Sequence, residues 1–178
     1  KENTYLRDSL NFTDRRKLKP IGAAIIARSN SSQNSSFVIN KGSEDGIFVG
    51  TPIIVGDGFF VGKVVKVNNR TSTVRASTDI QHATAVSVLH ESSTIGIAKG
   101  MSGNLINLKF IPNEQKIDIN NLVVTSGLEE NIPSGLIVGI VNSVTIDETA
   151  PFQEAVVEPL ISLDQYYNVI ALLQLKIW

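Results

Sequence analysis

The heptapeptide GFFVGKV at residues 58–64 decides the fold, because its pattern G-x-x-V-G-x-V returns as GLIVGIV at residues 135–141. Each copy follows an apolar run, and each half of the chain closes on a similar apolar segment, AVSVL at 85–89 and VIALL at 169–173. A period of roughly 70 to 80 residues is too long for a solenoid unit. The repeat therefore predicts two copies of one small β domain, which favours a binding or structural module over an enzyme.

Short apolar runs separated by glycine-rich turns continue from Ile21 to the end of the chain. Strands at roughly 8–12-residue spacing with glycine at their corners are typical of small barrels. We therefore predict an all-β fold of two similar small β-barrels in tandem, at residues 21–91 and 92–178. Strand exchange between the barrels would move that boundary.

Several residues are expected to act through turns and corners of the fold rather than through chemistry. Glycine inside a strand, as at Gly62 and Gly139, marks a bend or a close backbone approach. Glycine in a turn supplies a positive φ. The residues assigned to such structural roles are Gly42, Gly46, Gly50, Gly62, Gly127, Pro133, Gly135 and Gly139.

Residues 1–20 differ in kind from the rest. Asn3, Leu6 and Leu10 follow helical spacing, which predicts a short N-terminal helix that is either the end of a coiled coil or an ordinary amphipathic helix. The basic run at 15–19 then leads to Pro20, which ends a helix. This run is interpreted as a solvated linker in preference to a phosphate-binding segment.

The composition excludes several classes of function and kinds of site. A formal net charge of −1 excludes a generally basic nucleic-acid-binding surface, and the absence of cysteine removes thiolate nucleophiles and cysteine-ligated metals. No uncharged apolar run is long enough to span a bilayer as a helix. The chain begins at Lys1, so we expect a fragment of a longer protein. No cofactor and no metal site are expected.

One catalytic hypothesis follows from a pair of β-barrels, a chymotrypsin-like serine hydrolase. Its parts would be Ser126 as nucleophile, His82 or His90 as base, and Asp79 or Asp118 as the acid. The mechanism needs these groups within hydrogen-bond reach, with backbone donors for the oxyanion. A Gly-Asp-Ser-Gly nucleophile loop is missing, so we do not expect an enzyme.

An uncharged run suggests a partner-binding strand. Residues 132–146 carry no charge, whereas residues 58–70 carry two lysines and an arginine. Such a strand can bind a partner at little desolvation cost. We therefore expect Ile132, Leu136 and Val138 to contribute to partner binding, with burial in the core as the alternative.

The motifs in their order resemble those of MreC, the rod shape-determining protein family of bacteria. The resemblance rests on INKGSEDGIFVGTP at 39–52, the motif at 58–64, VTSGL at 124–128 and IPSGLIVGIV at 132–141. It covers essentially the whole chain. Two departures are Asn120-Asn121, where the family commonly has Gly-Asp, and the Ser/Asn/Gln tract at 29–36.

The resemblance implies a non-catalytic scaffold of the cell-elongation machinery that self-associates as a dimer or filament and activates peptidoglycan synthesis. The implied partners are an elongation-specific penicillin-binding protein, MreD, RodA and MreB. It also implies an extracytoplasmic location, with a membrane anchor through an N-terminal helix that precedes this sequence. The alternatives are the serine hydrolase and a cell-wall-binding β module.

Overall fold

The computed structural model describes residues 18–31, 34–89 and 94–174, and these residues are almost entirely strand and turn. The all-β class is confirmed. Two short 3₁₀ helices, η1 (Ser43–Asp45) and η2 (Leu163–Gln165), interrupt it. The strands are β1 (Leu18–Asn30), β2 (Ser35–Ile39), β3 (Pro52–Val55), β4 (Phe59–Val67), β5 (Ser72–Ala76), β6 (Ala83–Leu89), β7 (Thr94–Met101), β8 (Leu105–Pro112), β9 (Leu122–Thr125), β10 (Ile137–Thr145), β11 (Phe152–Glu158) and β12 (Asn168–Gln174).

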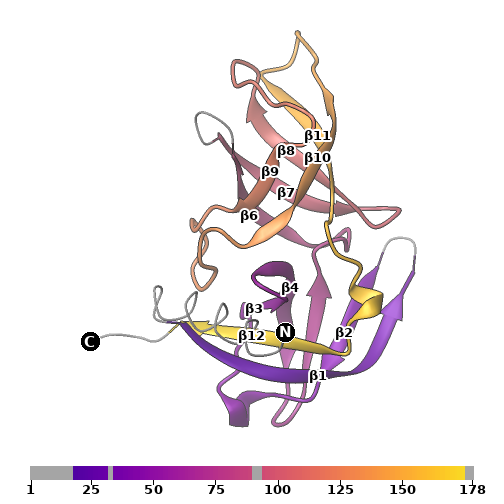
Figure 1. Ribbon diagram of the computed structural model, residues 1–178, viewed down its shortest axis with the longest axis vertical. Helices are drawn as coiled ribbons and strands as arrows, with labels where there is room; N and C mark the ends of the chain where they lie inside the picture. The colour runs from indigo at the N-terminus through magenta and orange to yellow at the C-terminus, as the bar shows by residue number, and fades with distance from the viewer. Residues whose placement is uncertain (1–17, 32–33, 90–93, 175–178) are drawn as a thin grey trace.

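The strands form two closed circuits of pairing, which lie one above the other along the longest axis (Figure 1). The second ring runs β11-β8-β7-β6-β9-β10 and returns to β11, making a closed six-stranded barrel. The first ring runs β4-β3-β12-β1-β2-β5 and returns to β4. Among the described strands, one parallel pair, Ile137 with Phe59, links the sheets of the two rings, and Ile137 N donates to Gly58 O at 2.8 Å.

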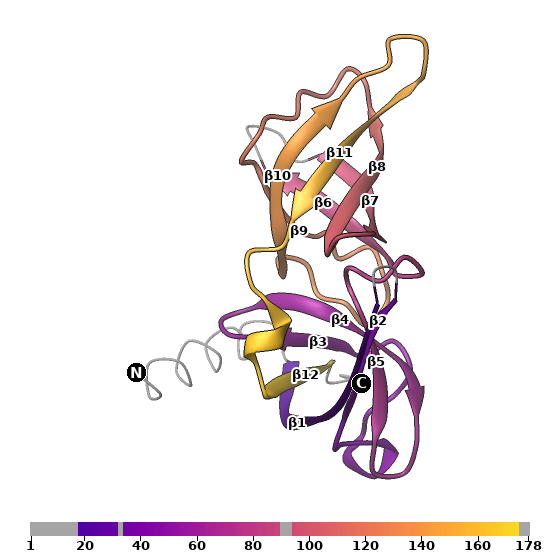
Figure 2. The same ribbon diagram turned by 90° about the vertical axis from the view of Figure 1, so that its right-hand side faces the viewer.

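The two closing segments of the repeat are exchanged between the rings. The strand that follows β5 in the chain, β6, pairs with β7 and β9 of the second ring. The strand that follows β11, β12, pairs with β1 and β3 of the first ring. The chain therefore crosses between the rings twice, at 77–82 and 159–167, as both views show (Figures 1 and 2). Strand pairing does not follow the boundary expected at residue 91. Strand β6 belongs to the second ring and strand β12 to the first, which is the strand exchange that moves this boundary.

The repeated glycines occupy matching registers. Gly62 lies opposite Ile53 of β3, and Gly139 lies opposite Val123 of β9. The next residue along pairs with the neighbouring strand, Lys63 with Arg75 and Ile140 with Glu158. A register shift then follows two residues after each glycine, at Val64 and at Val141. The shared motif therefore has the same local geometry in both rings.

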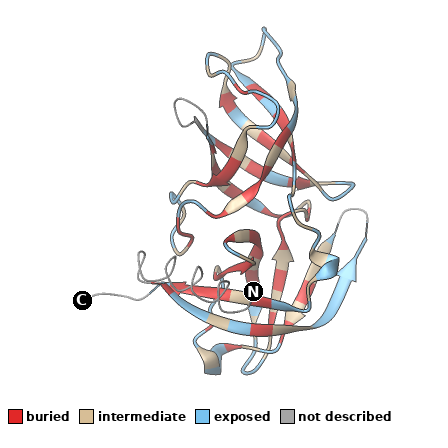
Figure 3. Cartoon of the chain, in the orientation of Figure 1, coloured by how far each residue is buried: buried red, intermediate tan, exposed pale blue. Residues whose placement is uncertain are grey.

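Two clusters of buried apolar residues fill the interior, and strands of both rings carry buried residues (Figure 3). One lies within the first ring. The other fills the second ring and includes Ile54, Phe60 and Leu172, which come from strands of the first ring. Burial of these three side chains makes the junction between the rings part of the core, and the hydrophobic effect stabilises that junction.

Some expectations fall outside the described residues. The predicted N-terminal helix and its basic linker lie in residues 1–17 for all but their last residues, and the tip of the polar tract lies at 32–33. Within the described residues, no helix has the length and apolar character needed to cross a membrane.

Candidate functional site

The three residues expected to bind a partner are core residues. Ile132, Leu136 and Val138 are 3%, 0% and 3% exposed and belong to the cluster that fills the second ring. Buried Thr125 holds this segment inward, because its Oγ1 donates to Pro133 O at 2.6 Å and accepts from Leu136 N at 2.9 Å. The structure favours the alternative in which the uncharged run packs the interior, and a partner has no access to these three side chains.

The seven glycines assigned to corners have a positive φ or lie at close backbone contacts, and Pro133 directly precedes the turn at Ser134 and Gly135. Gly46, Gly50, Gly127 and Gly135 have φ of 90°, 100°, 81° and 90°. Gly42 instead has φ −143°, and a Cβ there would lie 2.2 Å from Asn68 O, so close approach is its constraint.

The hydrolase hypothesis finds no support in the geometry of its proposed residues. Ser126 Oγ accepts from Leu128 N at 3.2 Å in a turn, and the Nε2 atom of buried His82 has no hydrogen-bond partner. The Asp79 carboxylate accepts from the backbone N–H groups of Ser35 and Gln81. His90 lies outside the described residues. Over 18–31, 34–89 and 94–174, no three His, Asp or Glu side chains gather as metal ligands.

The second ring presents a pair of aromatic side chains to solvent, Phe110 of β8 and Phe152 of β11. Phe110 is 57% exposed and Phe152 is 44% exposed. Their ring centroids are 5.7 Å apart and the ring planes meet at 82°, the edge-to-face arrangement that aromatic pairs prefer. We call these two residues the aromatic surface.

A β-bulge turns Phe110 outward. Ile111 pairs with Gln153 and Leu108 with Ala155, so Lys109 and Phe110 together oppose a single residue of β11. Phe110 has φ 63°, in the left-handed region that costs a bulky residue about 1–2 kcal/mol. Bulges of this kind re-aim side chains and are frequent next to functional sites. A strained backbone that exposes a phenyl ring is evidence for a binding role, because core packing does not require it.

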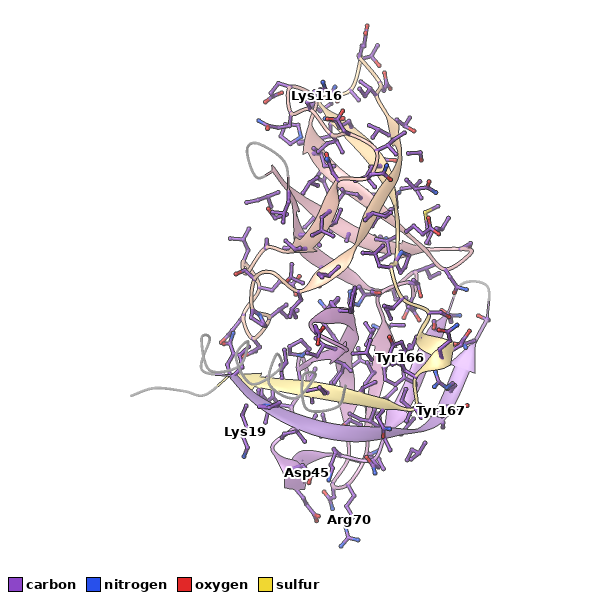
Figure 4. All side chains as sticks on the ribbon, viewed as in Figure 1. Lys19, Asp45, Arg70, Lys116, Tyr166 and Tyr167 are labelled. Carbon is purple, nitrogen blue, oxygen red and sulfur yellow. The ribbon has the colours of Figure 1, made fainter. Side chains whose placement is uncertain are left out.

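The aromatic surface lies on the second ring near its end that faces away from the first ring. Asn113, just after β8, donates from Nδ2 to Asp147 O and Ala150 O, which ties the β10–β11 hairpin to this end. Lys116, in the loop after β8, marks the same end (Figure 4).

The alternation of inward and outward side chains along β8 predicts the wrong position for Phe110. Ile106 and Leu108 point inward, so simple alternation puts Phe110 in the core as well. The core position belongs instead to Ile111, which is fully buried. The adjacent pair Phe110-Ile111 is the one local sign of the bulge, since two neighbours in a regular strand cannot both face inward.

Comparisons with known proteins agree with the resemblance. The family described as "Rod shape-determining protein MreC, barrel core" matches residues 25–172. The cell shape-determining protein MreC of Listeria monocytogenes is 31% identical over 164 residues, covering 89% of this chain and 55% of that protein. Its counterpart in Escherichia coli is 32% identical over 146 residues, covering 82% and 40% respectively. The chain therefore spans about half the length of these relatives.

Solved structures show the same fold. A Listeria monocytogenes MreC structure superposes with a TM-score of 0.82 at 29% identity, covering 97% of this chain and 84% of the other. A complex between Penicillin-Binding Protein (PBP2) and MreC from Helicobacter pylori contains a similar chain, with a TM-score of 0.67 at 17% identity, covering 86% of this chain and 97% of the other. The family match, the relatives and the fold lead to one conclusion: this chain belongs to the MreC family of rod shape-determining proteins.

Proposed function

We propose that the protein is a non-catalytic scaffold of the cell-elongation machinery, and that it binds a peptidoglycan-synthesising penicillin-binding protein through the aromatic surface. The observation that carries this proposal is the exposed pair of Phe110 and Phe152, with Phe110 held in a strained bulge. The Helicobacter pylori complex supports the class of partner, because a protein of this fold is there bound to PBP2.

Burial of the aromatic surface would supply much of the binding free energy. The two side chains together leave roughly 200 Å² exposed, which corresponds to about 5 kcal/mol when covered. Ordering and desolvation at an interface consume part of this gain. Aromatic side chains of this kind are the usual hot spots, whose truncation costs about 2 kcal/mol or more.

The remaining parts of the proposal follow from family membership. They are an extracytoplasmic location with a membrane anchor, self-association as a dimer or filament, activation of the bound synthase, and association with MreD, RodA and MreB. The matching registers of Gly62 and Gly139 support the view that the rings are tandem copies of one β-barrel domain whose closing strands are exchanged. The division of the chain into domains then follows the rings rather than residue 91.

Phe110→Gly tests the aromatic surface. Glycine adopts the left-handed conformation at no steric cost, and the relief of this strain offsets the entropic cost of glycine and the lost contact with Phe152, so this variant should stay close to the wild type in stability. It should bind the extracytoplasmic domain of the elongation-specific penicillin-binding protein at least 10-fold more weakly by isothermal titration calorimetry. Phe152→Ala should also weaken binding. The control is Tyr167→Ala, because Tyr167 is 75% exposed and lies beside the first ring, whereas Lys116 lies at the far end of the second ring (Figure 4).

Wild-type affinity in both phenylalanine variants would refute the aromatic surface as the binding site. Equal weakening in the Tyr167 variant would also refute it, since loss of any exposed aromatic would then have the same effect.

A further inference from the structure

A buried histidine lies where the chain first crosses between the rings. His82 ends the 77–82 crossover and is 3% exposed. Its ring lies 5.7 Å from the ring of Phe60, which belongs to β4 of the first ring. His82 Nε2 has no hydrogen-bond partner, and neither has Oγ1 of buried Thr84, two residues further along. The junction between the rings therefore buries a titratable group whose outer nitrogen is unpaired.

Charged groups from four segments, β4, β5, the 77–82 crossover and the β9–β10 loop, surround His82. Lys63 of β4 and Arg75 of β5 are the cations that act on it. Asp79 of the crossover accepts from backbone N–H groups and lies 3.9 Å from Arg75 Nε. Glu129, in the loop between β9 and β10, is paired with Lys63 at 3.0 Å. Asp79 already accepts backbone hydrogen bonds, and Glu129 is already paired with Lys63. Neither carboxylate is therefore free to accept a hydrogen bond from a protonated Nε2 of His82.

Lys63 and Glu129 form a clamp between the rings beside His82. Lys63 Nζ also donates to Ala83 O at 2.7 Å, and Glu129 Oε1 accepts from Ala85 N at 2.6 Å. The clamp joins β4 of the first ring to the first residues of β6 and to a loop of the second ring. A positive charge on His82 would be repelled by Lys63, one of the two members of this clamp.

We propose that the junction of the two rings is an acid-sensitive hinge, in which uptake of a proton by His82 separates Phe60 and β4 from the start of β6. The two crossovers remain as covalent links and the strand pairing within each ring is kept, so the rings change their relative orientation while Ile54, Phe60 and Leu172 at the junction become solvated. The hinge changes the position of the aromatic surface relative to the first ring.

The direction follows from proton linkage. Burial, followed by the charges of Lys63 and Arg75, lowers the pKa of His82 from 6.5 to about 3 in the closed form. In an opened junction water reaches the ring, and its pKa returns toward 6.5. The free energy that favours the closed over the open junction is therefore at its full value above pH 6.5. It decreases as the pH falls below that value. At pH 5 the ratio of open to closed molecules rises about 30-fold over its value at high pH.

The chain lacks cysteine, so two introduced cysteines can be labelled uniquely. Arg70→Cys and Lys116→Cys place spin labels at opposite ends of the molecule, one on each ring (Figure 4). Distances between the labels are measured by pulsed electron paramagnetic resonance at pH 7.5 and pH 5.0. Circular dichroism at both pH values reports whether the strands persist. The control carries His82→Phe, which keeps an aromatic ring beside Phe60 but does not titrate; His82→Gln replaces it if that variant does not fold.

We expect a second distance population at pH 5.0 with His82 present and none in the control, while circular dichroism stays unchanged. An unchanged distance distribution with His82 present would overturn the hinge, as would the same change in the control. Loss of strand signal at pH 5.0 would also overturn it, because the transition would then be global unfolding.

Discussion

Replacing Gly139 with alanine would place a Cβ 2.3 Å from the carbonyl oxygen of Glu158 and 2.9 Å from Val157 Cγ1. Cβ atoms essentially never approach another atom within 3.0 Å, so the oxygen would have to withdraw by about 0.7 Å (3.0 − 2.3). Glu158 is held in register opposite Ile140 within a closed ring, so it cannot move without shifting β11. Overpacking of this kind costs about 1–3 kcal/mol, and a backbone clash belongs at the upper end of that range.

Alanine also lowers the entropy of the unfolded chain, which offsets about 0.4–1 kcal/mol. The net expectation for Gly139→Ala is destabilisation by about 2 kcal/mol. For a domain of this size that corresponds to a fall in Tm of roughly 4–8 °C. Gly62→Ala should behave alike, because a Cβ at Gly62 would lie 2.3 Å from Arg75 O. Urea denaturation followed by circular dichroism, together with calorimetry, gives both quantities.

Gly22→Ala is the matched control, because Gly22 lies in strand β1 without a positive φ, and a Cβ added there would have nothing within 4 Å. It should be neutral or slightly stabilising. If all three alanine variants unfold at the same urea concentration, the close approach of neighbouring backbone does not explain the repeated glycines. The motif would then have to recur in the two halves for another reason.

The sequence predicts the fold class and the family because their signals are local. Each copy of G-x-x-V-G-x-V combines a strand pattern with a glycine at a close contact, and both can be recognised without knowing the partner strand. The exchange of β6 and β12 is not local. AVSVL and VIALL are both short apolar strands, so either fits either ring. Which ring each strand joins depends on the paths of the 77–82 and 159–167 crossovers, which strand patterns do not encode.

Sequence patterns are weakest at predicting the surface that we propose for partner binding. Lack of charge at 132–146 is equally compatible with a core strand and an interface strand. The hydrogen bonds of Thr125 with residues 133 and 136 turn this segment into the core, and the uncharged pattern does not reveal them. Phe110 escapes prediction because a bulge reverses the alternation at that point. His82 resembles a candidate catalytic base in the sequence, whereas its significance in the structure is its burial at the junction between the rings.

Two further variants test the packing of the second ring and the exchange of strands. Thr125→Val keeps the shape of a side chain that is 1% exposed but leaves Leu136 N and Pro133 O without their partner. Urea denaturation should therefore show a fall in the free energy of unfolding of about 2–3 kcal/mol. A fall smaller than the error of measurement would mean that this hydroxyl does not hold the segment inward. Ending the chain at Glu158 removes β12, which lies between β1 and β3 in the first ring. The first ring then opens, while all six strands of the second ring remain present. Amide hydrogen exchange should therefore show lost protection in β1 and β3, far from the cut in sequence, and retained protection in β7 and β8. A barrel built only from consecutive strands would respond in the opposite way, because β12 would then close the second half of the chain. Loss of protection confined to β7–β11 would accordingly contradict the exchange, whereas loss confined to the first ring would show that its closure depends on the last strand of the chain.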